Sequence, residues 1–139
     1  MSASLDLVRS IYADWERGDF GSAEWADPEI EFAFDGGPEP GRWMGLEEMS
    51  ARYGDWLRGW KDFRALPERY FVADGERILV FVQNSGRGRA SGVELAQSSV
   101  ANLFEIRAGK VVRLVLYWDR ERALADAGLT SDAAGADPD

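Results

Sequence analysis

The second half of the sequence predicts strands and no helix until its end, and this constrains the fold more than any other feature. Four segments rich in β-branched and aromatic residues are separated by short glycine-containing turns, and they fall at roughly 62–73, 76–86, 93–107 and 110–118. Strands joined by short turns pair antiparallel, because the chain has no length for a crossover connection. This half of the sequence therefore predicts an antiparallel meander.

The first half of the sequence predicts helices on either side of one strand. Residues 3–18 and roughly 46–60 place apolar side chains at three- and four-residue steps, as an amphipathic helix does. Residues 29–34 predict a short strand, with a short helical piece at 19–26 before it and a turn-rich loop after it. Helices and one strand, followed by a meander, give an α+β fold.

Length and composition fit one folded domain. At 139 residues with 45% apolar residues, the chain is long enough to bury one core but not two. We expect this domain to cover residues 1–129, and the acidic segment 130–139 to be a disordered tail. No run approaches about 18 apolar residues, and the N-terminus lacks the pattern of a secretory signal. We therefore expect no membrane span and a cytoplasmic location.

The sequence contains no histidine and no cysteine. Their absence excludes disulfides, thiolate and imidazole metal ligands, a cysteine nucleophile and histidine as a general base. Acid–base chemistry would have to come from Asp, Glu, Tyr, Lys or ordered water. A metal site built from carboxylates alone stays open, but no acidic residues converge toward one in the sequence, and we expect no metal and no cofactor. The net charge of -9 would repel a phosphate backbone, so we expect no nucleic-acid partner.

Two of the predicted strands carry apolar side chains on both faces. Residues 77–82 and 110–118 do not alternate between apolar and polar side chains, as a strand with one face in water should. Both faces of the sheet should therefore be covered, one by the helices and the other by a partner subunit. On this argument we expect a homodimer.

Four segments give the chain a resemblance to a known family. They are YADWERGDF (12–20), WADPEIEF (25–32), GLEEMSARY (45–53) and FEIRAGKVVRLVLYWDRERALADAGL (104–129). In their order and spacing the chain resembles the SnoaL-like branch of the nuclear transport factor 2-like (NTF2-like) superfamily. The resemblance implies a cone-shaped, cystatin-like α+β fold, in which a curved antiparallel sheet wraps around a long N-terminal helix and a deep pocket. This fold hosts isomerases, dehydratases, cyclases, epoxide hydrolases and non-catalytic members, so function depends on the site.

The active residues of ketosteroid-isomerase-like members carry over only in part. Those enzymes place a tyrosine and a protonated aspartate around an oxyanion, and they use a second aspartate as the base. By spacing, the tyrosine falls at Ile11, the oxyanion aspartate at Asn102 and the base at Phe32. Asn102 alone keeps a hydrogen-bond donor, so the resemblance implies that this base is missing.

The active residues of other members are absent as well. In limonene-epoxide-hydrolase-like members the catalytic carboxylate falls near Leu116 and its partners near Val100 and Asn102, none of which is charged. Scytalone-dehydratase-like members need two histidines. SnoaL-like cyclases use an aspartate as base, and Asp119 is the only nearby carboxylate that could take that role.

Asp119, the first candidate catalytic residue, has two interpretations. It stands between the last predicted strand and a short helix expected at 119–127, which should end at Gly128. An aspartate at such a joint commonly accepts hydrogen bonds from the first N–H groups of the helix, and we favour this role as N-cap. The alternative is a catalytic base at the mouth of the pocket. Strand alternation counts against it, because Asp119 points away from the pocket if Trp118 points inward.

Asn102 is the other candidate catalytic residue. It shares a predicted strand face with Val100 and Phe104, and a buried amide must find a hydrogen-bond partner. One interpretation is a bond to a neighbouring side chain such as Gln83. The other is a donor that points at a ligand carbonyl or oxyanion. The sequence leaves both open.

Aromatic side chains make up most of the predicted ligand-binding set. Trp43 follows the Pro/Gly loop and Trp118 ends a strand, so both are expected near the mouth of the pocket. The aromatic residues of the two long helices have helical spacing, which favours a plain core role over ligand contact. The complete predicted set is Tyr12, Trp15, Trp43, Tyr53, Trp56, Phe104, Leu116 and Trp118.

These residues predict an apolar pocket for a small hydrophobic molecule that carries a carbonyl or hydroxyl group. Three functions are compatible with it: an isomerase- or cyclase-type enzyme that transfers a proton, a non-catalytic binding protein, and a dimerising module with an unused pocket. An Asp or Glu within reach of Asn102 would favour the enzyme. An aromatic cavity would favour the binding protein, and a filled cavity the dimerising module.

Overall fold

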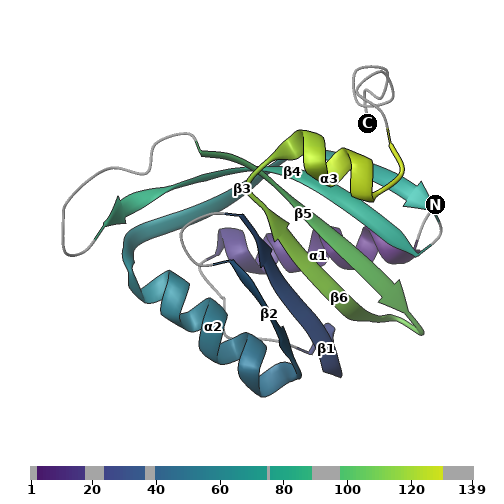
Figure 1. The fold of residues 1–139 in the computed structure, drawn as a ribbon, viewed down its shortest axis with the longest axis horizontal. Coiled ribbons are helices and arrows are strands. Elements are labelled where there is room, and N and C mark those ends of the chain that lie inside the picture. Colours follow the sequence, from purple (N-terminus) through teal and green to yellow (C-terminus); the bar gives the residue numbers. More distant parts are fainter. Residues whose placement is uncertain (1–2, 18–23, 37–39, 75, 89–97, 130–139) are drawn as a thin grey trace.

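The computed structural model describes residues 3–17, 24–36, 40–74, 76–88 and 98–129 (Figure 1). This part of the chain forms three helices and one six-stranded sheet. In chain order the elements are α1 (Ala3–Glu16), β1 (Ala26–Asp35), β2 (Gly41–Met44), α2 (Leu46–Arg58), β3 (Trp60–Asp74), β4 (Arg77–Gly88), β5 (Ser98–Arg107), β6 (Lys110–Tyr117) and α3 (Arg120–Asp126). The predicted tail at 130–139 lies outside the described residues, so the domain boundary at residue 129 stays a prediction.

The strands lie in the order β2-β1-β6-β5-β4-β3. β3 to β6 form the predicted antiparallel meander, and β1 pairs antiparallel with β2. β1 and β6 are parallel, with Phe32 opposite Leu114 and Phe34 opposite Leu116. The predicted α+β fold with a curved sheet is confirmed, although this one pairing is not antiparallel. β2, α2 and the first three strands of the meander supply the long connection that a parallel pair needs.

β2 is the strand that the sequence does not predict. Residues 41–43 fall in the predicted turn-rich loop, but residues 41–44 pair with β1 and place Trp43 opposite Phe32. A segment of four residues is too short to show a clear alternation of apolar and polar side chains. The short helix predicted at 19–26 is wrong at its end, because Glu24 and Trp25 form a turn and Ala26 begins β1. Residues 18–23 lie outside the described part.

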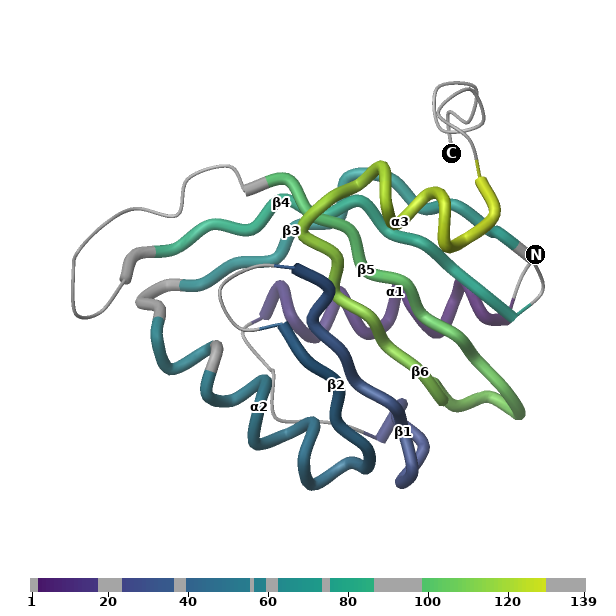
Figure 2. Tube along the Cα trace, in the orientation of Figure 1, coloured from purple at the N-terminus to yellow at the C-terminus, as the bar shows by residue number. Residues whose placement is uncertain are grey.

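α1 and α2 cover one face of the sheet, which we call the inner face, and they bury the main core there. From α1 come Val8, Ile11, Tyr12 and Trp15, which recur every three or four residues along the helix. The strand residues that alternate onto the inner face include Phe32, Val80, Val82, Phe104 and Leu114, all at most 1% exposed. Each such side chain contributes about 1.5–3 kcal/mol. Figure 2 shows α1 lying across the strands, where these side chains pack together.

α3 covers the opposite, outer face of the sheet. Ala123, Leu124 and Ala127 are buried against side chains of four strands, namely Phe71, Leu79, Phe81, Leu103, Val115 and Tyr117. The argument that a partner subunit covers this face is therefore wrong, because the chain's own last helix lies on it (Figure 1). The homodimer itself stays a prediction.

Candidate functional site

The inner face of the sheet contains a small pocket near the point where β6 runs into α3. The lining residues are Phe34, Tyr53, Phe63, Ala65, Asn84, Val100, Asn102, Leu116, Tyr117 and Trp118. Strand alternation accounts for several of them, because Val100 and Asn102 on β5 face the same side as Leu116 on β6. The pocket has a volume of about 30 Å³, which is room for one or two water molecules.

Asn102 is the polar centre of this region. Its Nδ2 donates a hydrogen bond to the Tyr12 hydroxyl at 2.7 Å. Asn102 is 6% exposed and, tyrosine aside, is the only polar side chain in the buried core of the described residues. Tyr12 is buried as well, so the bond is shielded from bulk water and each group depends on the other for a partner.

The structure corrects the predicted surroundings of Asn102. The suggested partner Gln83 is wrong, because Asn102 lies opposite Val80 on β4, whereas Gln83 lies opposite Ser99 and donates to its Oγ at 2.9 Å. Gln83 and Asn102 therefore belong to opposite faces of the sheet. On α1, Tyr12 rather than the neighbouring Ile11 contacts Asn102.

The hydroxyl groups near Asn102 are neutral at ordinary pH. Burial raises the pKa of Tyr12 well above its usual value, and the hydrogen bond from Asn102 offsets part of this rise. Burial also raises the pKa of Tyr53, which lines the pocket. The described lining residues include no Asp, Glu, Lys or Arg, and Asn84 is the only other amide. The pocket thus offers neutral donors and acceptors, without a carboxylate for proton transfer in its described lining.

Four predicted site residues line the pocket: Asn102, Tyr53, Leu116 and Trp118. The sequence did not assign Phe34, Phe63, Ala65, Asn84, Val100 or Tyr117 to it. Two of these carried a usable signal, since Val100 shares a strand face with Asn102, and Asn84 shares one with Val82. Phe63 and Ala65 reach the pocket through the register of β3 with β4, which contains irregularities that no sequence pattern indicates.

The remaining predicted ligand-binding residues lie outside the lining. Tyr12 is in the core, with the rings of Trp15 and Phe104 edge-on to it at 4.9 and 5.9 Å between centroids. Trp43 packs edge-on against Phe34 at 5.8 Å. For Tyr12, Trp15 and Phe104 the structure favours the core role. Trp56 belongs to α2, but its side chain lies outside the described part of the structure.

Asp119 caps α3, as predicted. Its Oδ1 accepts a hydrogen bond from the backbone N–H of Glu121 at 2.9 Å, and its own backbone is extended. At the other end Gly128, at φ 76°, ends the helix, and the N–H of Leu129 donates to the Leu124 carbonyl, as in a Schellman motif. Asp119 is not among the lining residues of the pocket. A catalytic role for Asp119 stays a prediction.

Charged side chains gather on the outer face instead. Glu31 forms ion pairs with Arg42 at 3.0 Å and with Arg113 at 3.4 Å. Glu105 pairs with Arg107 at 3.5 Å in the same region. Across the described residues, no group of three or more His, Cys, Asp or Glu could hold a metal ion. Nor is any helix in that part of the chain long and apolar enough to cross a membrane.

Comparison with known proteins places the chain in a family. A model of the SnoaL-like domain matches residues 8–114. The chain therefore belongs to the SnoaL-like family, within the NTF2-like superfamily that its sequence resembles. No curated protein matches the chain.

Solved structures share the fold at low sequence identity. An NTF2-like protein of Burkholderia thailandensis is 21% identical with a TM-score of 0.75, over 96% of this chain and 98% of that one. A Mesorhizobium loti protein described as a SnoaL-like polyketide cyclase is 16% identical with a TM-score of 0.68, over 81% and 97%. TerC, co-crystallised with polyporic acid, is 18% identical with a TM-score of 0.71, over 91% and 99%. At these identities the likeness shows the fold and not the activity.

Proposed function

We propose that the chain binds a small apolar molecule in the inner-face pocket, and that Asn102 orients a carbonyl or hydroxyl group of that molecule. The observation that carries the proposal is the buried Asn102–Tyr12 hydrogen bond beside a pocket whose described lining is uncharged. A neutral amide and neutral phenols suit a neutral polar group, whereas a charged group would lack a counter-charge there. Aromatic and aliphatic side chains would bury the rest of the molecule.

The pocket must open to admit such a molecule. Its volume of about 30 Å³ is well below the roughly 300 Å³ of a small ligand site. Tyr53, Leu116 and Trp118 are only partly buried, so these lining side chains have room to turn. A pocket of this size also fits a module without a ligand, and a binding measurement separates the two functions.

A proton-transfer enzyme is the second candidate. The Tyr12–Asn102 pair favours it, because ketosteroid-isomerase-like enzymes hold an oxyanion with a tyrosine and a residue at the position that resembles Asn102. The described lining supplies no carboxylate as base, and the Asp119 carboxylate is engaged as a helix cap. We therefore rank binding above catalysis.

The substitution Asn102→Leu tests the binding proposal. Titration calorimetry with naphthol and naphthalene compares a ligand that has a hydroxyl group with one that lacks it. We expect the wild type to bind naphthol more tightly than naphthalene. Asn102→Leu should weaken naphthol binding about 5- to 150-fold, which corresponds to about 1–3 kcal/mol for a lost hydrogen bond. Naphthalene should bind both proteins about equally.

Two controls make this test specific. Asn84→Leu removes the other amide of the lining and should change the naphthol preference much less. Asp119→Asn keeps the helix cap and should leave binding unchanged. A wild type that binds neither probe would refute the proposed function. A preference that depends on Asn84 instead would refute the role of Asn102.

We also retain the homodimer and the cytoplasmic location as proposals. Support for the homodimer comes from apolar side chains on the two edge strands, where Met44 of β2 is 59% exposed and Val72 of β3 is 48% exposed. Exposed edges of this kind favour pairing with another chain. Sedimentation equilibrium at micromolar concentration should give twice the mass of one chain, and a monomer mass would contradict the proposal.

A further inference from the structure

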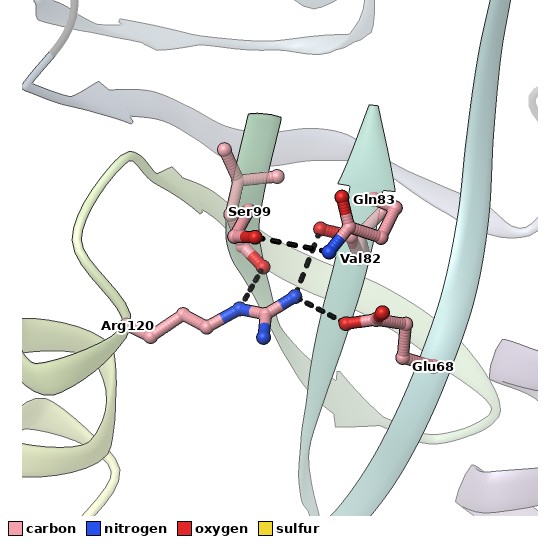
Figure 3. Close-up of polar contacts among 6 residues, drawn as sticks. Glu68, Val82, Gln83, Ser99 and Arg120 are labelled. Atoms are coloured by element: carbon pink, nitrogen blue, oxygen red, sulfur yellow. Dashed lines mark hydrogen bonds and ion pairs between the residues drawn. The ribbon is translucent and has the colours of Figure 1, made fainter. Parts of the chain in front are cut away.

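Arg120, the first residue of α3, lies across the outer face of the sheet (Figure 3). Its Nε donates to the carbonyl of Val100 at 3.1 Å, and its Nη2 donates to the carbonyl of Val82 at 3.2 Å. The same Nη2 pairs with Glu68 Oε1 at 2.6 Å, and the guanidinium lies 4.4 Å from the centroid of the Phe81 ring. A planar cation with several donors can make all these contacts at once, which the single ammonium of lysine cannot.

The two carbonyls belong to residues that face each other on neighbouring strands, next to the point where the β5–β6 pairing stops. Val82 on β4 lies opposite Val100 on β5. On its other side Val82 is paired with Pro67 of β3, which has no N–H to donate. β6 pairs with β5 only as far as Ala101, so Val100 lies beyond the last pair. Arg120 thus supplies donors where the β5–β6 ladder ends and where Pro67 offers Val82 no N–H.

This place is also a wall of the pocket. Val100 lines the pocket from β5, and Trp118, two residues before Arg120, lines it from the end of β6. Only Asp119 separates Trp118 from Arg120, and its side chain is held as the cap of α3. The guanidinium therefore restrains the backbone on both sides of this wall. It contacts the Val100 carbonyl directly, and it holds Trp118 through the short stretch of chain that joins Trp118 to Arg120.

We propose that Arg120 is a positioning residue for the pocket: acting from the outer face, it fixes Val100 and Trp118 and thereby limits the size of the ligand that the pocket admits. The effect of Arg120 on the position of Trp118 does not require a bound ligand. The part of the proposal that concerns ligand size rests on the proposed binding function. The contacts run through backbone carbonyls, so Arg120 restrains the chain itself and not only a neighbouring side chain.

The other attachments of α3 provide matched controls. Arg122, two residues after Arg120 on α3, pairs with Asp35 at 2.8 Å, and neither residue lines the pocket. Arg122→Met therefore removes an ion pair of the same helix but neither of the two carbonyl contacts of Arg120, and it leaves the backbone bond from the Trp118 N–H to the Asp35 carbonyl in place. Glu68→Gln removes the ion pair of Arg120 but leaves its two carbonyl contacts in place.

The first measurement follows Trp118 without any ligand. Incorporation of fluorotryptophan gives Trp118 its own fluorine NMR resonance, which is assigned by its loss in Trp118→Phe. Arg120→Met keeps an unbranched, largely apolar side chain but removes the guanidinium and with it every hydrogen bond that Arg120 donates. Arg120→Lys keeps the charge and serves if Arg120→Met does not fold. We expect the Trp118 resonance to shift or broaden in the Arg120 variants and to stay in place in Arg122→Met and Glu68→Gln.

The second measurement compares the affinities of phenol and naphthol, a smaller and a larger probe. Arg120→Met should change their affinity ratio at least about fivefold in favour of naphthol, and Arg122→Met should not. A lower melting temperature with an unchanged Trp118 resonance in a folded Arg120 variant would overturn the proposal, as would an equal shift in Arg122→Met. If the wild type binds neither probe, the proposed function fails, while the resonance still decides whether Arg120 positions Trp118.

Discussion

At the scale of single residues, the Tyr12–Asn102 hydrogen bond is a buried polar contact within the otherwise apolar inner face. Its two ends are 90 residues apart in sequence, so the bond ties α1 to β5. Both side chains are almost completely buried, and both are uncharged at ordinary pH. Removing either partner therefore leaves the other unpaired in the core.

A double-mutant cycle measures this coupling. Tyr12→Phe leaves the Asn102 Nδ2 without its partner, and Asn102→Leu leaves the Tyr12 hydroxyl without its partner. Each should lower the free energy of unfolding by about 1–3 kcal/mol. The double variant should cost less than the sum, because no polar group is left unpaired. Urea denaturation of the three variants gives the values, and strictly additive costs would contradict the coupling.

The sequence predicted one half of this bond. Strand alternation placed Asn102 between two apolar residues on a buried face, and Asn102 is indeed buried there. The partner could not be predicted, because it depends on how α1 is rotated about its axis. Ile11 and Tyr12 are both at most 1% exposed, so burial alone does not tell which of them faces β5.

At the scale of elements, the hydrogen bonds at the ends of α3 stabilise this short helix in addition to its packing against the sheet. Asp119→Ala removes the acceptor for the Glu121 N–H and should lower the stability of the protein by about 1 kcal/mol. Asp119→Asn keeps an acceptor and should cost much less. Thermal denaturation of the two variants compares these costs. If Asp119→Asn abolished a measured activity at unchanged stability, Asp119 would be a base rather than only a cap.

The sequence predicted the long elements better than their pairing. α1, α2 and the meander from β3 to β6 carry enough residues for their periodicity to show, and all are present. β2 was missed because it spans only Gly41–Met44. The parallel pairing of β1 with β6 was missed because it joins strands that are distant in sequence, and side-chain alternation is the same in both directions.

At the scale of the whole molecule, one chain buries both faces of its sheet. The apolar residues on both sides of β4 and β6 suggested a partner subunit, yet Leu79, Leu103 and Val115 of the outer face are at most 4% exposed in the single chain. α3 is short, and its small residues let it lie close to the sheet. Its first residue, Arg120, then links this outer layer to the pocket on the inner face.

This burial also predicts how the molecule responds to alkaline pH. The chain has four tyrosines, Tyr12, Tyr53, Tyr70 and Tyr117, and burial is the largest cause of a raised pKa in each. Unfolded tyrosines lose their protons near pH 10, whereas the folded chain keeps them to higher pH. Above about pH 10 the unfolded state therefore binds fewer protons, and the free energy of unfolding falls as pH rises. Below that range the tyrosines add no pH dependence.

Ultraviolet titration of the tyrosinate band tests this expectation, with circular dichroism as the measure of folding. The native protein should show little tyrosinate at about pH 10, and the urea-unfolded protein should show about half of its full signal there. In the native protein the rise of the band should coincide with the loss of circular dichroism, because ionisation and unfolding are linked. A folded chain with more than half of its four tyrosines ionised near pH 10 would require Tyr12 or Tyr53 to be ionised. That result would contradict the neutral, enclosed character of the inner face on which the proposed binding site depends.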